Sequence, residues 1–348
     1  MIYLTGDTHA DFTRLSERYT ERKGVHLTAD DYVIVCGDLG LCWTPGSTFE
    51  RKCDFLEERP CTVLWVQGNH ENYDMIREFA IEEWHGGKVR HIVRDKVILL
   101  ERGQVFHIEG KTFFTFGGAT SHDVQGGILD RNAEDFRDKL ELARESGLPY
   151  RILGESWWPE ELPSKEEMAE GLENLGRANY EVDYVITHCC STGMLRVLEP
   201  GPGHLYESDI LTDYFEQIEE KLRYKHWYFG HYHEDMKIDS QHTVLYRAMI
   251  PLGDKEADLS GIPRLGHPVY QRGDMVAFRH YWKNQEMVGQ IAVVDPYGTF
   301  EQEEEPSYDI YTEDCLYKHI LESEVIGRVN GGGNHENFTF IKRSGRLR

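Results

Sequence analysis

The 348-residue sequence predicts an α/β protein with a layered sheet, because short apolar runs alternate with amphipathic stretches from residue 1 to about residue 249. About 40% of the residues are apolar, which suffices for one large domain or two ordinary ones. The longest unbroken apolar run, residues 32–36, has five residues, whereas a membrane-spanning helix needs about 20. We therefore expect a protein that does not cross a membrane.

Each element of this fold follows from a local pattern. Apolar, mostly β-branched runs predict buried strands at residues 2–4, 32–36, 62–66, 184–186 and 227–229. Amphipathic spacing predicts helices at residues 11–23, 48–58, 73–83 and 210–222. Residues 105–108 and 112–116 flank Glu109-Gly110-Lys111, a pattern that is typical of a β-hairpin.

Three departures from the alternation divide the chain. Residues 122–180 are charged and helix-prone, which predicts a helical insertion or cap on a main domain of residues 1–250. Residues 251–326 become strand-like and predict a small β-rich domain that could close into a barrel. Residues 327–348 are basic and glycine-rich, so we expect a flexible tail.

The charge balance limits the partners. The chain carries 61 acidic against 38 basic side chains, a net charge of −23, which repels nucleic acid and anionic membrane surfaces. None of its seven cysteines forms a CxxC pair, so we expect reduced thiols rather than a disulfide framework. The first residues are strand-like, without a basic region or an apolar signal core, which predicts a cytoplasmic protein. The oligomeric state stays open.

Five short motifs each follow a predicted strand. They are Gly6-Asp7-Thr8-His9, Gly37-Asp38-Leu39-Gly40, Gly68-Asn69-His70-Glu71, Thr187-His188 and Gly230-His231-Tyr232-His233. Loops beyond the carboxyl ends of strands in an open α/β sheet meet at one crevice, so these side chains should lie together. Mixed imidazole and carboxylate ligands suit Mn, Fe, Zn, Co or Ni, and a carboxylate can bridge two such ions. The motifs therefore predict a two-metal site.

In this order, the five motifs resemble those of the calcineurin-like metallophosphoesterase superfamily over about residues 1–250. The resemblance implies a β-sandwich flanked by helices, with a binuclear metal centre at the strand ends. One metal would take Asp7, His9, Asp38 and His233. The other would take Asp38, Asn69, His188 and His231, so that Asp38 bridges the two. Residues 117–160 also resemble a bacterial subgroup of that superfamily, whose substrate is uncertain.

The resemblance also implies an activity. It predicts a phosphohydrolase that cleaves phosphomonoesters or phosphodiesters by attack of a metal-bridging hydroxide, with two divalent ions, manganese first among them. Asn69 and His70 would be the catalytic residues, because His70 stands where the family has its catalytic histidine, which assists the leaving group. Two alternatives remain open, namely a nuclease-like phosphodiesterase acting on nucleic acid and a non-catalytic metal-binding scaffold.

The sequence departs from one branch of the superfamily. Phosphoprotein phosphatases continue the second motif with Asp-Arg-Gly, whereas this chain has Leu39-Gly40-Leu41-Cys42-Trp43. The Arg that would grip a phosphate is thus missing from that loop, and phosphoprotein substrates are disfavoured. Residues 121–123 could reach the mouth of the site, and Arg151 is a candidate phosphate clamp.

A second copy of the third motif occurs near the end of the chain. Residues 333–337 repeat the pentapeptide of residues 68–72 letter for letter. No strand-like run directly precedes the second copy, and no Asp-x-His pair lies nearby in the sequence. We therefore expect His335 to belong to the tail and not to the metal site.

Overall fold

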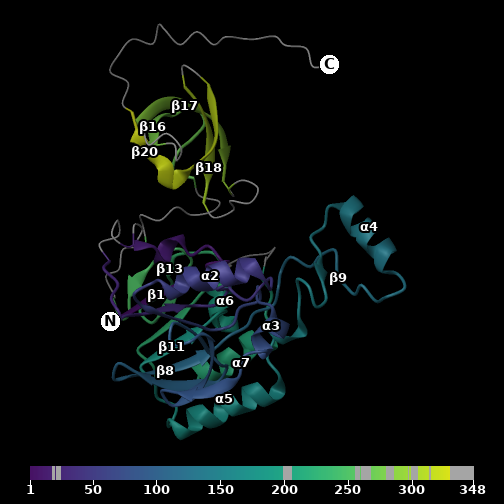
Figure 1. Ribbon diagram of the computed structural model, residues 1–348, viewed down its shortest axis with the longest axis vertical. Helices are drawn as coiled ribbons and strands as arrows, with labels where there is room; N and C mark the ends of the chain where they lie inside the picture. Colours follow the sequence, from purple (N-terminus) through teal and green to yellow (C-terminus); the bar gives the residue numbers. More distant parts are fainter. Residues whose placement is uncertain are drawn as a thin grey trace. The chain divides into compact units, whose positions relative to one another are not determined.

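The computed structural model describes residues 1–17, 20, 25–198, 206–254, 259, 268–279, 286–296, 298, 305–312 and 315–329. These residues form two compact units, Met1–Ser260 and Gly261–Arg348 (Figure 1). The larger unit holds all five motifs. Residues 333–337 lie outside the described residues.

The first sheet of the larger unit has a parallel centre. Its seven strands, in the order β15-β1-β2-β3-β6-β5-β4, are β15 (Ile250–Pro251), β1 (Ile2–Thr5), β2 (Tyr32–Val35), β3 (Thr62–Trp65), β6 (Val97–Leu100), β5 (Gly87–Val93) and β4 (Ile81–Trp84). Strands β1, β2, β3 and β6 are parallel neighbours. Both faces of β2 and β3 are buried, which explains their unbroken apolar runs.

The second sheet is also parallel at its centre. Its six strands, in the order β13-β14-β12-β11-β8-β7, are β13 (Met236–Lys237), β14 (His242–Val244), β12 (His226–Phe229), β11 (Tyr184–Thr187), β8 (Lys111–Phe116) and β7 (Gln104–Ile108). Strands β14, β12, β11 and β8 are parallel neighbours. The inner faces of the two sheets meet, and the backbone N–H of Gly253 donates to the Tyr228 hydroxyl at 3.1 Å.

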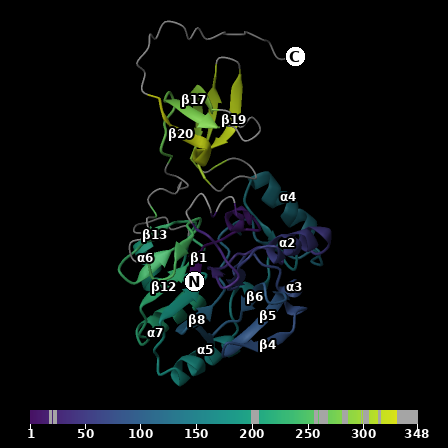
Figure 2. The same cartoon turned by 60° about the vertical axis from the view of Figure 1, so that its left-hand side comes forward.

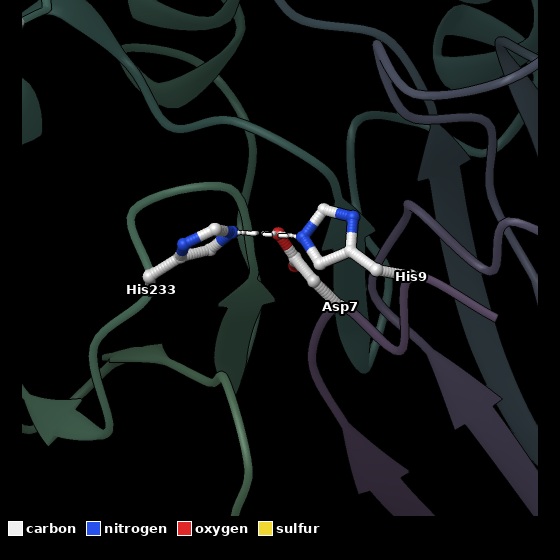
Figure 3. A group of neighbouring side chains, drawn as sticks. All are labelled: Asp7, His9 and His233. Atoms are coloured by element: carbon white, nitrogen blue, oxygen red, sulfur yellow. Dashed lines mark hydrogen bonds and ion pairs between the residues drawn. The ribbon is translucent and has the colours of Figure 1, made fainter. Parts of the chain in front are cut away.

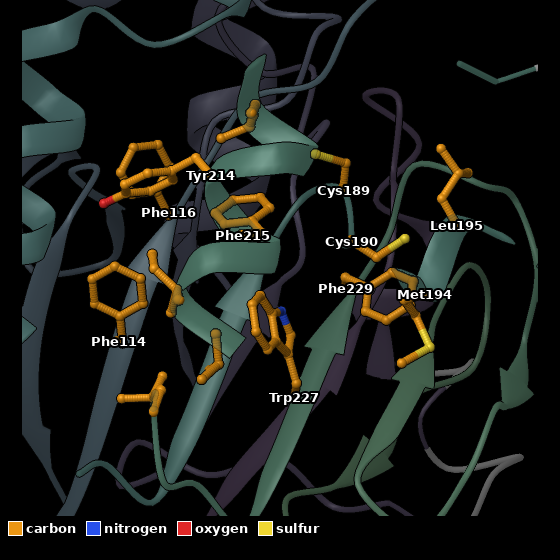
Figure 4. Packing of buried hydrophobic residues seen from close by; sticks show 14 of the residues in the cluster. Phe114, Phe116, Cys189, Cys190, Met194, Leu195, Tyr214, Phe215, Trp227 and Phe229 are labelled. Carbon is orange, nitrogen blue, oxygen red and sulfur yellow. The ribbon is translucent and has the colours of Figure 1, made fainter. Parts of the chain in front are cut away.

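Helices cover the outer faces of the two sheets. On the first sheet lie α2 (Ser47–Glu57) and α3 (Tyr73–Arg77), and on the second lie α5 (Lys165–Arg177), α6 (Thr192–Leu198) and α7 (Ile210–Glu219) (Figure 2). The second sheet packs on α7 through an aromatic cluster, in which Phe215 lies 5.6 Å from Phe116 and 5.7 Å from Trp227 between ring centroids (Figure 4). These apolar contacts fix the positions of the strand ends that carry the site.

After β8 the chain of the larger unit extends away from the sheets as an arm. It contains β9 (Ile128–Leu129), α4 (Phe136–Ser146) and β10 (Arg151–Ile152), and in Figure 1 its helix stands apart from the sheets. The arm returns through Trp158, whose indole N–H donates to Asp74 at 2.8 Å and whose ring packs edge-on against Trp43. The short helix η2 (Pro159–Glu161) follows directly. The root of the arm is therefore anchored to the main body.

The smaller unit has a core of its own. Its antiparallel sheet, in the order β19-β18-β17-β16-β20, consists of β19 (Leu316–Leu321), β18 (Ser307–Tyr311), β17 (Glu286–Asp295), β16 (Met275–Arg279) and β20 (Val325–Arg328), with η3 (Glu322–Glu324) before the last strand. Val276, Phe278 and Ile310 are fully buried in it.

The predicted α/β fold, with sheets flanked by helices and a small C-terminal β-sheet, is confirmed. The helix predicted at residues 73–83 is wrong in its second half, because α3 ends at Arg77 and β4 begins at Ile81. His85 and Gly86 both have positive φ and form the tight turn from β4 to β5, a hairpin signal that the helical interpretation overlooked. Of the helix predicted at residues 11–23, the described part contains η1 (Thr13–Leu15).

The helices of the larger unit are short or amphipathic. Within the described ranges, none combines the length and the apolar character that are needed to span one.

Candidate metal centre

The parallel register of the strands brings the five motifs together. The loops after β1, β2 and β3 come from the first sheet, and those after β11 and β12 come from the second. Among the described residues, two groups of side chains have donor atoms within 4.8 Å of one another: Asp7 with His9 and His233, and Asp7 with Asp38 and His188. Convergence of strand ends, expected from the sequence, thus occurs across both sheets.

The first group joins the start of the chain to the fifth motif (Figure 3). The Nε2 atoms of His9 and His233 are 2.9 Å apart. Asp7 Oδ2 lies 3.4 Å from His233 Nε2 and 3.8 Å from His9 Nε2. The two imidazoles therefore turn the same nitrogen toward one carboxylate oxygen.

The second group is centred on His188, which is fully buried. Its Nδ1 donates to the Cys36 carbonyl at 2.8 Å, so Nε2 is the nitrogen that faces the site. Nε2 lies 3.5 Å from Asp38 Oδ2 and 3.1 Å from Asn69 Oδ1. Asp38 Oδ2 is also 3.8 Å from His9 Nδ1, which places it between the two groups.

His231 lies at the edge of the second group. Its ring centroid is 5.0 Å from that of His188, and its backbone N–H donates to Asp7 Oδ1 at 3.0 Å. The ring also packs against Tyr206, with centroids 5.0 Å apart. All seven residues that the sequence predicts as metal ligands thus lie within one cluster.

The backbone at these positions is unusual. His9, Asp38, His231 and His233 have φ between 44° and 70°, a left-handed region that non-glycine residues seldom adopt. Such conformations cost about 1–3 kcal/mol each and persist only where the surrounding structure enforces them, as in tight turns and functional sites. The fold therefore holds these four residues in an unfavourable backbone conformation, which sets the direction of their side chains.

Two glycines leave room for the carboxylates. A Cβ on Gly68 would lie 1.8 Å from Asp38 Oδ1, and a Cβ on Gly230 would lie 2.3 Å from Asp7 Oδ1. No side chain fits at either position without displacing its carboxylate. The glycine that opens the third and the fifth motif is therefore a spatial requirement of the site.

The charges of the cluster shift its pKa values strongly. Burial would raise the pKa of Asp7, but His188 and His233 outweigh burial and lower it to about 2. Burial would lower the pKa of His188, but Asp38 and Asp7 outweigh burial and raise it to about 9. Burial lowers the pKa of His70 to about 4. Without other cations, the buried carboxylates thus hold a proton on His188.

The donor set fits a metal. Asp7 Oδ2 is buried without a hydrogen-bond partner, and beside it the Nε2 atoms of His9 and His233 are only 2.9 Å apart. Groups that accept hydrogen bonds avoid such proximity unless a proton or a cation lies between them. Imidazole nitrogen combined with carboxylate oxygen is the ligand chemistry of first-row transition metals.

His70 lies beside this cluster. Its backbone N–H donates to Asp38 Oδ1 at 2.7 Å, and its ring centroid is 5.1 Å from that of His9. Arg151 Nη2 is 3.3 Å from both of its ring nitrogens. Trp43, from the loop after Asp38, lies on another side with ring centroids 6.2 Å apart.

Several supporting residues have no signal in the sequence. The Arg14 guanidinium donates to the carbonyls of Gly6, Asp7 and Tyr246, and so fixes the loop that carries Asp7. Tyr246 is 232 residues from Arg14 along the chain, so no local pattern could predict this contact.

A second supporting chain orients the Asn69 amide. Asn69 Nδ2 donates to Ser121 Oγ at 3.2 Å, and Ser121 in turn donates its N–H and its hydroxyl to Glu161, which is 2% exposed. The amide oxygen of Asn69 is thereby turned toward His188. Of the three residues 121–123, the sequence offered only a general expectation that they reach the site.

The fold and the acceptor-rich cluster together define a metal-dependent hydrolase of the layered α/β class. Residues 1–235 match the calcineurin-like phosphoesterase family, and the chain belongs to that family. It is accordingly an enzyme that hydrolyses phosphoesters with divalent metal, as the sequence predicted.

Among solved structures, a similar chain is the phosphopantetheinyl hydrolase of Mycobacterium tuberculosis, with 14% sequence identity and a TM-score of 0.33. The similarity covers 71% of this chain and 89% of that one. None of the curated proteins matches this chain.

Proposed function

We propose that the enzyme is a binuclear phosphohydrolase that cleaves phosphomonoesters or phosphodiesters. The observation that carries the proposal is the pair of donor groups joined by carboxylates, with His9 and His233 on one side and His188 on the other. A single ion would need only one of these groups. Two groups that share the Asp7 carboxylate, with Asp38 beside both, are the arrangement that two adjacent ions require.

The ligand assignment is the one that the family resemblance implies, and the position of Asp38 between His9 and His188 supports it. Asp7, His9 and His233 hold one ion together with Asp38, whose Oδ2 faces both His9 and His188. Asn69, His188 and His231 hold the other ion with the same carboxylate. Asp38 is therefore the bridging ligand in this proposal.

The ligand chemistry narrows the choice of ions. The mixture of imidazole, carboxylate and amide favours Mn, Fe, Zn, Co or Ni over Ca and Mg, and manganese is our first choice. When bound, the two ions lower the pKa of a water molecule toward neutrality and bind phosphoryl oxygens. The chain's own contribution is to hold the ligands close together before the substrate arrives.

His70 and Asn69 take part in the reaction. His70 lies beside the cluster without belonging to either donor group, so its ring is available to protonate or stabilise the leaving alkoxide. Asn69 faces the second group through Oδ1, and its amide is fixed by Ser121. Asp38 Oδ1 accepts a hydrogen bond from the His70 backbone N–H at 2.7 Å. This bond fixes the position of His70 relative to the proposed metal ligands.

A substrate panel tests this function. The enzyme loaded with Mn, Ni, Co, Zn or Mg is offered phosphomonoesters, phosphodiesters, single-stranded RNA and duplex DNA. We expect hydrolysis of small esters and little cleavage of nucleic acid, because a net charge of −23 repels polyanions. Cleavage restricted to nucleic acid would favour a nuclease, and bound metal without turnover of any ester would favour a scaffold.

A further inference from the structure

Arg151, a residue of the arm, places its positively charged guanidinium beside the metal centre. It opens β10, its side chain is 11% exposed, and its guanidinium lies against His70, 81 residues earlier in the chain. Asp123, also in the arm, accepts from Nε at 2.9 Å and from Nη2 at 2.5 Å. This two-pronged pair fixes both the position and the plane of the guanidinium.

The pairing leaves part of the guanidinium available. Of its five N–H donors, Asp123 accepts two, and the Ser156 carbonyl accepts one from Nη1 at 3.3 Å. The terminal nitrogen Nη2 also lies 3.3 Å from each ring nitrogen of His70. With the Nη2 contact to His70 included, four of the five donors have partners among the described residues, and one N–H of Nη1 remains available to a ligand.

Arg14 provides a contrast within the same site. It is also buried beside the cluster, but its donors are used by the Thr5 hydroxyl and by three backbone carbonyls. Arg14 therefore supports the Asp7 loop from behind. Arg151 approaches from the arm instead, next to the residue that we place at the leaving group.

A phosphate ester needs a donor at this point. The ligands of the cluster are acceptors, and the two proposed ions would neutralise only the phosphoryl oxygens that face them, so an oxygen on the His70 side needs a separate donor. Planar guanidinium groups match phosphoryl oxygens in charge and in spacing. The loop after Asp38 supplies no basic side chain between Leu39 and Ser47.

We propose that Arg151, positioned by Asp123, binds a non-bridging phosphoryl oxygen of the substrate beside His70. This inference rests on the proposed phosphohydrolase function and deepens it. The arm thereby completes the substrate site, while the strand-end loops of the two sheets supply the metal ligands. Substrates whose phosphoryl group carries two negative charges should gain most from this contact, which favours phosphomonoesters over phosphodiesters.

The test uses the Mn-loaded full chain with p-nitrophenyl phosphate, bis-p-nitrophenyl phosphate and inorganic phosphate as a competitive inhibitor. For Arg151→Gln we expect kcat/KM for the monoester to fall about 10–100-fold, the range of one charge-assisted contact. The inhibition constant of phosphate should rise by a similar factor. The diester should lose less, about 3-fold, and metal content should stay unchanged.

The matched control is Arg131→Gln. Arg131 also lies in the arm and pairs with a carboxylate, Glu155, but it is 55% exposed, and its recorded partners, Glu155 and Phe136, are both residues of the arm. This variant should keep wild-type kinetics. A loss in Arg151→Gln that equals the loss in Arg131→Gln, or one accompanied by loss of metal, overturns the inference.

A second, more conservative variant keeps the test valid if Arg151→Gln does not fold. Arg151→Lys keeps the charge but loses the two-pronged geometry, so its phosphate inhibition constant should rise about 3–10-fold. A constant equal to that of the wild type overturns the inference. Failure of the proposed function is distinguishable, because the wild-type enzyme would then hydrolyse no ester at all.

Discussion

Single residues at the centre are held in place by contacts that need no metal. His188 is oriented by the Cys36 carbonyl, Asn69 by Ser121, and Asp7 by the backbone N–H of His231. His233 stacks on Tyr246, with ring centroids 4.4 Å apart and planes 15° from parallel. Such outer contacts fix ring orientation and keep the coordinating nitrogen free. The ligands are therefore arranged before an ion binds.

The two aspartates should differ in what they hold. Asp38→Asn should remove both metals, because its Oδ2 lies between His9 and His188, whereas Asp7→Asn should remove about one of the two. Elemental analysis of the purified variants measures this directly. Since Asp7 is a member of both donor groups, the reverse order of losses would make Asp7 the bridge.

His70 should matter for turnover and not for metal binding. His70→Ala is expected to lower kcat by roughly 10²–10⁴ with both metals retained, because the ring acts on the leaving group. The loss should shrink with p-nitrophenyl esters, whose leaving group needs little protonation. The control is His335→Ala in the repeated pentapeptide, for which we expect kcat to change less than about twofold. A large loss of kcat in His335→Ala with little loss in His70→Ala would refute the assignment.

Secondary-structure elements connect the site to distant parts of the larger unit. Helix α7 ends at Glu219, whose carboxylate lies 3.2 Å from Nε2 of His242 at the start of β14. Asp239 contacts the other ring nitrogen at 2.8 Å. These contacts join the helix layer to the strand beside β12, which leads directly into the loop of His231 and His233.

This contact predicts a pH-dependent stability. Burial would lower the pKa of His242, but the hydrogen bonds and charges of Glu219 and Asp239 outweigh burial and raise it above 6.5. A raised pKa in the folded state means that the contribution is complete below pH 6.5 and is lost as pH rises through the folded value. His242→Gln should thus lower the free energy of unfolding more at pH 6 than at pH 9.

Urea denaturation at both pH values measures this difference. Exposed His26 provides the control, since His26→Gln should change stability little at either pH. A penalty for His242→Gln that grew with pH would contradict the assigned ion pair.

At the scale of the molecule, the enzyme concentrates buried negative charge between two sheets. Asp7 and Asp38 are each 1% exposed, and the lowered pKa values keep both ionised. A cation that binds only the folded chain stabilises it by an amount that grows with the logarithm of the cation concentration. Metal content should therefore control both activity and stability.

Chelation tests this coupling. Removing the metal should abolish ester hydrolysis and lower Tm, and Mn²⁺ should restore both. At about 100 times its dissociation constant an ion adds about 2.7 kcal/mol, or roughly 5–10 °C for a unit of this size. Differential scanning calorimetry with parallel rate measurements follows both effects, and full activity in a preparation shown to be free of metal would refute the proposal.

Much of this architecture could be predicted from local patterns, because the apolar runs, the hairpin at Glu109 and the strand-end motifs are short-range signals. The strands β4 and β5 were missed because amphipathic spacing concealed the His85-Gly86 turn. The partners of Asn69 and His70 could not be found in this way. Ser121 and Arg151 reach them only after the arm has folded back, across 52 and 81 residues.

The contact between His9 and His233 has a consequence for the order of folding. It closes a loop of 224 residues, whereas the contact between Asp38 and His70 closes one of 32. By chain entropy alone the longer closure costs about 2 kcal/mol more. The first sheet can gather its own aspartates early, but the histidines of the second sheet arrive only when the two layers have docked. Each proposed ligand set therefore becomes complete only when the two sheets have docked, because both sets take histidines from the second sheet.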